Sequence, residues 1–309
     1  MMSLICILLN QVFGYDKSWV KLHSMDDTTT DHDLKIAQHN FVGDTGYYFT
    51  DEGEFLDKSG NKFEYAVHPI QTKNQERYED VGEAVTDHIY KVMENDFNLE
   101  RVPIPRESKD EKTSFVFMSE GFIESPRRKL VLINGSGAVK AGQWARSIII
   151  NDNLMSGSML PYIEWANKNE YDILVLNTNE CDSDYPGSTN PIEHAQTVWN
   201  DILSHVSDSS VFIVAHSFGG VVVQRLARMN EQFNNVIGKI AFTDSVHFGG
   251  IDTEADCINW VSSREPVNAN LDYGSSSSCS VRSAGTTKHP WTSHFAMDSI
   301  FEWFCESTP

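Results

Sequence analysis

Residues 209–226 have the sequence SSVFIVAHSFGGVVVQRL, and this stretch decides the fold. Its apolar residues 211–214 predict a buried strand, and the spacing from Gly219 onward predicts a helix. Between them lies AHSFGG, which has the strand–turn–helix setting of a nucleophile elbow. A serine in such a turn occupies a strained backbone position and needs small neighbours. The stretch therefore predicts Ser217 as a nucleophile, with Ala215 where glycine is more common.

The segments around this motif alternate between short apolar runs and amphipathic runs. Predicted strands lie at residues 115–118, 130–133, 173–176, 211–214, 240–242 and 258–261. Predicted helices lie at residues 75–93, 161–169, 191–204, 219–230 and 297–304. Short, fully apolar strands separated by amphipathic helices are typical of a mainly parallel sheet covered on both faces. We therefore expect an α/β-hydrolase-like, three-layer fold.

The chain before this alternating region has a different pattern. Segments 47–50, 54–56 and 62–65 are separated by turn-rich residues and predict a hairpin. With the first predicted helix they form an N-terminal extension to the sheet. Residues 1–40 are polar and acidic without periodicity, which predicts a flexible arm. The expected organisation is this arm followed by a single α/β-hydrolase-like domain at 41–309.

Charge and cysteine usage exclude several classes of function. The chain has 309 residues, and 44 acidic against 24 basic side chains give a formal net charge of −20. A surface this anionic repels phosphate backbones, so we do not expect direct nucleic-acid binding. The scattered cysteines include no C-x-x-C pair, which argues against a disulfide framework and a zinc site and suits a reducing compartment. These cysteines are Cys6, Cys181, Cys257, Cys279 and Cys305. No motif calls for a metal or other cofactor.

A serine nucleophile requires a histidine base and a carboxylate that orients the histidine. In α/β-hydrolases the acid and then the histidine follow the serine along the chain. Asp244 and Glu265 each follow a predicted strand. We prefer Glu265 as the acid because it lies one strand and one helix-length connection further on, and Pro266 turns the chain there. Asp244, directly after the strand that follows the nucleophile helix, is the alternative acid.

Three histidines after Ser217 are candidates for the base: His247, His289 and His294. His289 lies in a glycine-containing loop between a strand-like segment and the final predicted helix, where the histidine of an α/β-hydrolase is expected. His247 precedes the preferred acid along the chain, and His294 lies nearer the final helix. His289 is therefore the predicted base.

The oxyanion hole of such a site combines the backbone N–H that follows the nucleophile with an N–H from an earlier loop. Phe218 supplies the first of these groups. The sequence KLVLINGSG at 129–137 is a strand that ends in a glycine-rich loop, and Ser136 in this loop is expected to supply the second. Neither a P-loop nor a dinucleotide-binding motif is present. A cap that selects the substrate is expected from residues 142–162 and 181–190.

With these segments identified, the sequence resembles the Argonaute-binding-protein-two (Arb-two) domain family, in particular its animal cotranscriptional regulators. The resemblance covers roughly residues 41–305, and GSGAVKAGQWAR is its most specific segment. The segments that carry it are FVFMSE (115–120), LINGSGAVKAGQWARSIIIND (132–152), LVLNTNE (174–180), PIEHAQTVWND (191–201), FIVAHSFGG (212–220), TDSVH (243–247), NWVSSREP (259–266) and SAGTTKH (283–289). The resemblance implies an α/β-hydrolase fold with its nucleophile at Ser217.

The resemblance also implies a nuclear role, with Argonaute and chromatin or splicing proteins as partners in siRNA-linked heterochromatin silencing and alternative splicing. The apolar residues 4–9, LICILL, leave a signal peptide as an alternative, although the run is short and no basic residue precedes it. No segment has the length of a membrane span. Two hypotheses follow. The first is a regulator that presents a hydrolase fold to protein partners. The second is a serine hydrolase acting on an ester, amide or thioester, and the two are compatible.

Overall fold

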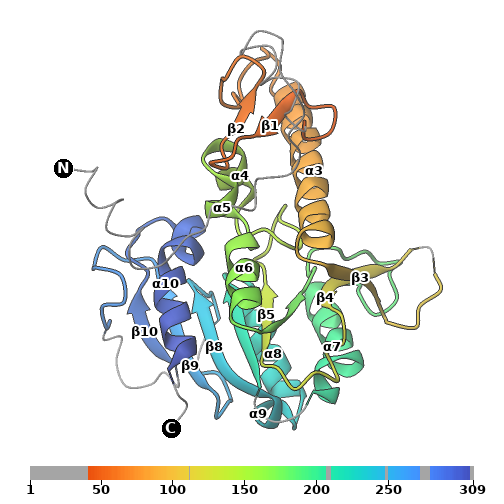
Figure 1. Ribbon diagram of the computed structural model, residues 1–309, viewed down its shortest axis with the longest axis vertical. Coiled ribbons are helices and arrows are strands. Elements are labelled where there is room, and N and C mark those ends of the chain that lie inside the picture. Colours follow the sequence, from red (N-terminus) through yellow and green to blue (C-terminus); the bar gives the residue numbers. More distant parts are fainter. Residues whose placement is uncertain (1–40, 111, 207–209, 248–249, 272–278, 307–309) are drawn as a thin grey trace, which may run out of the picture.

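The computed structural model describes residues 41–110, 112–206, 210–247, 250–271 and 279–306. The predicted arm at 1–40 lies outside the described residues. The described chain forms an eight-stranded sheet with helices on both faces and a separate two-stranded hairpin (Figure 1). The predicted fold class is thereby confirmed. No helix in this described part is both long and apolar enough to cross a membrane.

The sheet is parallel over most of its width and antiparallel at one edge. Its strand order is β10-β9-β8-β7-β5-β6-β4-β3, with antiparallel pairing between β6 and β4 and between β4 and β3. The strands are β3 (Leu99–Ile104), β4 (Ser114–Ser119), β5 (Lys129–Ile133), β6 (Asp172–Val175), β7 (Val211–His216), β8 (Ile237–Thr243), β9 (Asp256–Val261) and β10 (Ser280–Ser283). The chain reverses strand order between β5 and β6, so β7 lies directly against β5.

Two hydrophobic clusters cover the two faces of the sheet, because alternate residues of each strand point to opposite sides. In β5, Leu130 and Leu132 belong to the first cluster, and Val131 and Ile133 belong to the second. The first cluster includes α3 (Gln71–Asn95), α6 (Leu160–Lys168) and α10 (Thr292–Cys305). The second includes α7 (Pro191–Asp201), α8 (Gly219–Met229) and α9 (Phe233–Val236). The sheet is thus the middle of three layers.

The hairpin and α3 extend away from the sheet at the top of Figure 1. The hairpin consists of β1 (Tyr47–Phe49) and β2 (Phe55–Asp57), and the short helices α4 (Arg146–Asn151) and α5 (Leu154–Gly157) lie beneath it. The predicted third strand at 62–65 is wrong, because only Lys62 bridges to the hairpin. Beyond Lys62 the chain turns to α3, where Arg77 donates a hydrogen bond to the Glu64 carbonyl.

The edge strand β3 was not predicted because Pro103 interrupts its pattern. Proline lacks an N–H, and edge strands can tolerate it. In the sheet Pro103 pairs with Phe115 of β4, and the other side of β3 has no strand neighbour among the described residues. The predicted helix at 191–204 ends at Asp201 and is followed by the 3₁₀ turn η2 (Leu203–His205). A second 3₁₀ turn, η3 (His289–Trp291), precedes α10.

A fully buried histidine joins three segments of the fold. His194 of α7 has its Nδ1 within 3.2 Å of the Ser114 hydroxyl and 3.0 Å of the Ser188 hydroxyl. Its Nε2 accepts a hydrogen bond from the Asn177 N–H at 3.4 Å. Burial disfavours the charged imidazolium and lowers the pKa of His194 to about 3. The histidine is therefore neutral in the folded protein at ordinary pH.

This buried histidine makes stability depend on pH. In the unfolded chain His194 takes up a proton near its ordinary pKa of 6.5, whereas the folded protein resists protonation down to about pH 3. The contribution of the neutral His194 to the free energy of unfolding is fully present above pH 6.5. It is lost as pH falls below that value, by up to about 1.4 kcal/mol per pH unit. We expect the free energy of unfolding, measured with urea at each pH, to fall less steeply between pH 6.5 and 4 in His194→Gln than in the exposed-site control His205→Gln. Equal slopes would contradict the assignment.

Candidate active site

Ser217 lies in a sharp turn between β7 and α8. Its backbone has φ 51°, in the left-handed region that a residue with a Cβ rarely adopts. The Ser217 N–H donates to the Thr243 carbonyl at 3.0 Å, which anchors the turn to β8. A Cβ on Gly219 would come within 2.8 Å of the Ile133 carbonyl oxygen, so the helix can start this close to β5 only with glycine there. The local structure is that of the predicted nucleophile elbow.

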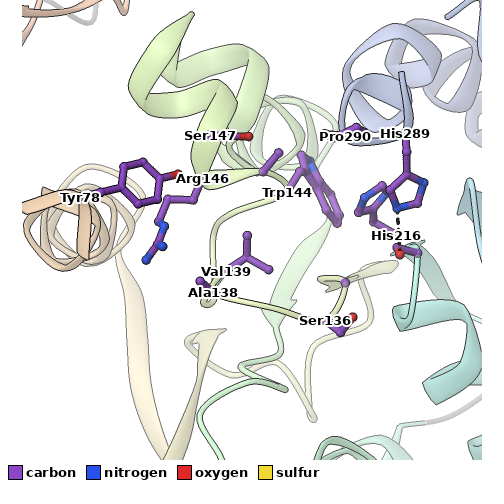
Figure 2. Close-up of a pocket in the computed structure, with 13 residues that line it drawn as sticks. Tyr78, Ser136, Ala138, Val139, Trp144, Arg146, Ser147, His216, His289 and Pro290 are labelled. Carbon is purple, nitrogen blue, oxygen red and sulfur yellow. Dashed lines mark hydrogen bonds between the residues drawn. The ribbon is translucent and has the colours of Figure 1, made fainter. Parts of the chain in front are cut away.

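His289 connects Ser217 to a carboxylate. Its Nε2 lies 3.0 Å from the Ser217 Oγ, and its Nδ1 lies 2.7 Å from the Asp244 Oδ2. In Figure 2 the dashed line that starts at His289 marks its hydrogen bond to Ser217. The three side chains come from the ends of β7 and β8 and from η3. They form one continuous hydrogen-bonded chain at the carboxyl edge of the sheet.

The carboxylate that hydrogen-bonds to His289 belongs to Asp244, the alternative acid, and not to Glu265, which we preferred from the sequence. Asp244 directly follows β8, which pairs with the nucleophile strand β7. Glu265 follows β9, one strand further from β7, and its side chain is exposed. Its backbone is engaged elsewhere, because its N–H bonds to Ser263 and its carbonyl accepts from Ser283. The strand order therefore places the alternative acid beside the histidine.

The environment of Asp244 favours its ionised form. Burial alone would raise the pKa of this carboxyl, but hydrogen bonds from His289 and Ser262 outweigh burial and hold the pKa below its ordinary value. The Ser262 N–H donates to the Asp244 Oδ1 at 3.1 Å, which leaves the Oδ2 for His289. Asp244 has a left-handed backbone, with φ 49°. An anion at this position favours the His289 tautomer that carries its proton on Nδ1.

A second histidine, which the sequence analysis did not single out, supports His289. His216 immediately precedes the nucleophile and is buried, and its ring centroid lies 4.8 Å from that of His289. Its Nδ1 lies 2.9 Å from the Thr243 carbonyl and donates to it. Burial, aided by the nearby His289, lowers the pKa of His216 to about 4. His216 is therefore a neutral ring on which His289 packs. Its position directly before Ser217 in the elbow motif is the sequence feature that could have identified it.

The other two candidate bases make different contacts. His247 has its Nδ1 2.6 Å from the Ser245 hydroxyl and packs against Phe242. His294 of α10 packs edge-on against Trp291 of η3. Among the described residues, neither histidine hydrogen-bonds to Ser217. The structure thus brings only His289, of the three, to the nucleophile.

The glycine-rich loop after β5 lies directly against the nucleophile. A Cβ on Gly135 would come within 3.0 Å of the Ser217 Cβ, so a larger residue at 135 would push the loop away. Ser136 lines the pocket next to Ser217, and Phe218 is the residue at the N-cap of α8. That the backbone N–H groups of Phe218 and Ser136 form an oxyanion hole stays a prediction.

Residues of the NTNE segment, 177–180, hold this loop in place. The Asn179 Nδ2 donates to the carbonyls of Gly135 and Val139, both at 2.8 Å. The Lys140 Nζ forms an ion pair with Glu180 at 2.6 Å and also donates to the Asn179 carbonyl at 3.0 Å. These contacts bridge the loops that follow neighbouring strands β5 and β6. The glycine-rich loop is thus held by contacts with the segment that follows β6.

Ser217 and His289 open into a pocket with a volume of about 260 Å³. The expected cap segment 142–162 contributes lining residues, whereas 181–190 contributes none of them. Tyr78 of α3 also lines the pocket, which nothing in the sequence indicated. The lining residues are Tyr78, Gly135, Ser136, Ala138, Val139, Trp144, Ala145, Arg146, Ser147, His216, Ser217, His289 and Pro290. Within the described ranges there is no cluster of three or more potential metal ligands.

A serine on an elbow, hydrogen-bonded through histidine to aspartate at the carboxyl edge of a mainly parallel sheet, defines the α/β-hydrolase class. The family within this architecture is given by sequence comparison. The Arb2 domain model matches residues 40–184 and 180–266, and the chain belongs to that family.

Three relatives are similar to this chain over most of its length. The Cotranscriptional regulator ARB2A homolog of Xenopus tropicalis is 34% identical over 75% of this chain and 70% of its own length. The human Cotranscriptional regulator ARB2A is 32% identical over 85% of this chain and 79% of its own. The FAM172 family protein homolog Y75B8A.31 of Caenorhabditis elegans is 37% identical over 83% of this chain and 84% of its own.

Solved structures match less closely. The histone deacetylase Clr3 aligns with a TM-score of 0.48 at 12% identity, over 79% of this chain and 46% of the deacetylase chain. An esterase from Pyrobaculum calidifontis aligns with a TM-score of 0.31 at 11% identity, over 60% of this chain and 54% of its own. The fold assignment rests on the strand order and pairing of this chain rather than on these similarities.

The two candidate acids can be separated by a matched pair of amide substitutions. Asp244→Asn keeps the shape of the side chain but removes the charge that fixes the His289 tautomer. Reaction of Ser217 with a fluorophosphonate should then slow by roughly 10³- to 10⁴-fold. Glu265→Gln makes the same chemical change on an exposed side chain and should leave the rate unchanged. A slower reaction in Glu265→Gln, with an unchanged rate in Asp244→Asn, would identify Glu265 as the acid instead.

Proposed function

We propose that this chain is a gene-regulatory protein built on a serine-hydrolase fold, with a working Ser217–His289–Asp244 site. The observation that carries the enzymatic half is the continuous hydrogen-bonded chain from the Ser217 hydroxyl to the Asp244 carboxylate. Side chains from three separate segments meet there with hydrogen-bond distances of 3.0 and 2.7 Å. A serine kept for packing alone would need neither a left-handed backbone nor a partly buried acid hydrogen-bonded to the histidine.

The chemistry supported by this geometry is acyl transfer to water. The Ser217 Oγ attacks the carbonyl carbon of an ester, amide or thioester while His289 Nε2 takes the hydroxyl proton. Asp244 stabilises the resulting imidazolium, and the Phe218 and Ser136 N–H groups stabilise the oxyanion. His289 then protonates the leaving group, and the acyl group remains on Ser217. Water, activated by His289, cleaves this acyl-enzyme and restores the serine.

The regulatory half of the proposal rests on the family. Relatives at 32–34% identity over most of this chain are named cotranscriptional regulators. We extend this to a nuclear role with Argonaute and chromatin or splicing proteins as partners, in small-RNA-linked heterochromatin silencing and alternative splicing. The net charge of −20 supports basic protein surfaces as partners and disfavours direct contact with nucleic acid.

A second candidate function is an active serine hydrolase that has no gene-regulatory role. The observation favouring it is that the nucleophile opens into a pocket rather than being covered by side chains. An open site suits turnover of a small ester, amide or thioester. The two candidates differ in whether protein partners are bound, and not in the chemistry of the site.

The enzymatic half is tested by labelling the purified full-length protein with a fluorophosphonate probe. We expect one equivalent of label on the wild type and none on Ser217→Ala. The variant should melt at the same temperature as the wild type, since the substitution removes only a hydroxyl. A folded wild-type protein that takes up no label would remove the hydrolase from the proposal.

The regulatory half is tested by binding to purified Argonaute from the same organism. If the fold is a docking platform, wild type and Ser217→Ala should bind Argonaute with the same affinity. Absence of binding to Argonaute, with full labelling by the probe, would favour the hydrolase without a regulatory role.

A further inference from the structure

The pocket has a second functional end, opposite the nucleophile. Figure 2 shows Tyr78 and Arg146 on one side of Trp144 and His289 on the other. Arg146 begins α4, and Tyr78 comes from α3. The Arg146 guanidinium lies over the Tyr78 ring, with its central carbon 4.7 Å from the ring centroid. A cation is thus held at the far end of the pocket from Ser217.

This cation has no carboxylate partner in the described part of the chain. No Asp or Glu side chain there lies within ion-pair distance of the Arg146 guanidinium, and none of its five N–H groups makes a hydrogen bond with a described residue. Lys140, six residues earlier in the same motif, is paired with Glu180 at 2.6 Å. The segment GSGAVKAGQWAR therefore provides two cations. Lys140 helps to hold the glycine-rich loop, and the N–H groups of Arg146 are available to a ligand.

The position of Arg146 is built by its surroundings. A Cβ on Gly82 of α3 would come within 2.7 Å of the Arg146 Nη1 and 3.0 Å of its central guanidinium carbon. The glycine therefore leaves the space in which the guanidinium lies against the helix. Arg146 is half-buried, so part of its hydration is already lost. A half-buried guanidinium without an anionic partner favours an incoming anion, and its planar fork matches a carboxylate or a phosphate.

We propose that Arg146 and Tyr78 form a subsite for an anionic group on the molecule that enters this pocket. Combined with the proposed function, this makes the substrate an ester or thioester whose acyl chain carries a carboxylate or phosphate. Ala138, Val139 and Trp144 lie between the two ends and offer apolar surface to the connecting methylene groups (Figure 2). In a chain with a net charge of −20, anion preference has to come from such a local cation.

The test measures binding to Ser217→Ala protein, so that it does not depend on turnover. The ligands are monomethyl esters of glutaric, adipic and suberic acids, each compared with its neutral dimethyl ester by calorimetry. Methyl 4-phosphonobutyrate, as the phosphonate counterpart of the glutarate ester, distinguishes a phosphate-type group from a carboxylate. We expect at least one anionic ester to bind roughly 10- to 100-fold more tightly than its dimethyl ester, the range of a hydrogen-bonded charge pair.

Adding Arg146→Gln should abolish this preference, whereas Arg146→Lys, which keeps the charge but loses the fork, should retain part of it. The matched control is Arg225→Gln, on an exposed face of α8 away from the pocket, which should retain all of it. Equal binding of charged and neutral esters by the Ser217→Ala protein would overturn the proposal, as would a preference that survives Arg146→Gln. Failure of fluorophosphonate labelling, by contrast, would bear on the hydrolase alone.

Discussion

The site depends on one backbone constraint, the left-handed conformation of Ser217 between β7 and α8. A residue with a Cβ rarely adopts this conformation, so the surrounding structure has to hold it. The constraint is satisfied by close packing, because Gly219 lies against the carbonyl of Ile133 and Gly135 lies against Ser217 itself. The glycine-rich loop after β5 and the turn after β7 are therefore packed directly against each other.

Strand order accounts for the other two members of the hydrogen-bonded chain. Because β8 is the immediate neighbour of β7, a residue just beyond β8 is close enough to support a histidine above the serine. Asp244 takes that place, and the loop from β10 to α10 brings His289 between them. His289 has two neighbours with different roles. The neutral His216 packs against its imidazole ring, and the ionised Asp244 hydrogen-bonds to its Nδ1.

The sequence was most informative where the relevant signal is local. The elbow, the glycine-rich loop and the alternation of strands and helices each lie within a few consecutive residues, so their structures follow from spacing and residue type. The choice between Asp244 and Glu265 depends instead on which strands are neighbours, and both lie at strand ends in the sequence. Tyr78 could not be predicted for the same reason, because only the packing of α3 against α4 brings it to a pocket on the carboxyl edge of the sheet.

The position of the proton on His289 tests most directly whether Asp244 orients the imidazole towards Ser217. Nuclear magnetic resonance of protein with ¹⁵N-labelled histidine, with the His289 signals assigned by their loss in His289→Gln, reports which ring nitrogen carries it. For the neutral ring we expect a strongly downfield proton on Nδ1, hydrogen-bonded to Asp244, with Nε2 unprotonated towards Ser217. A neutral His289 with its proton on Nε2 and a bare Nδ1 would contradict it.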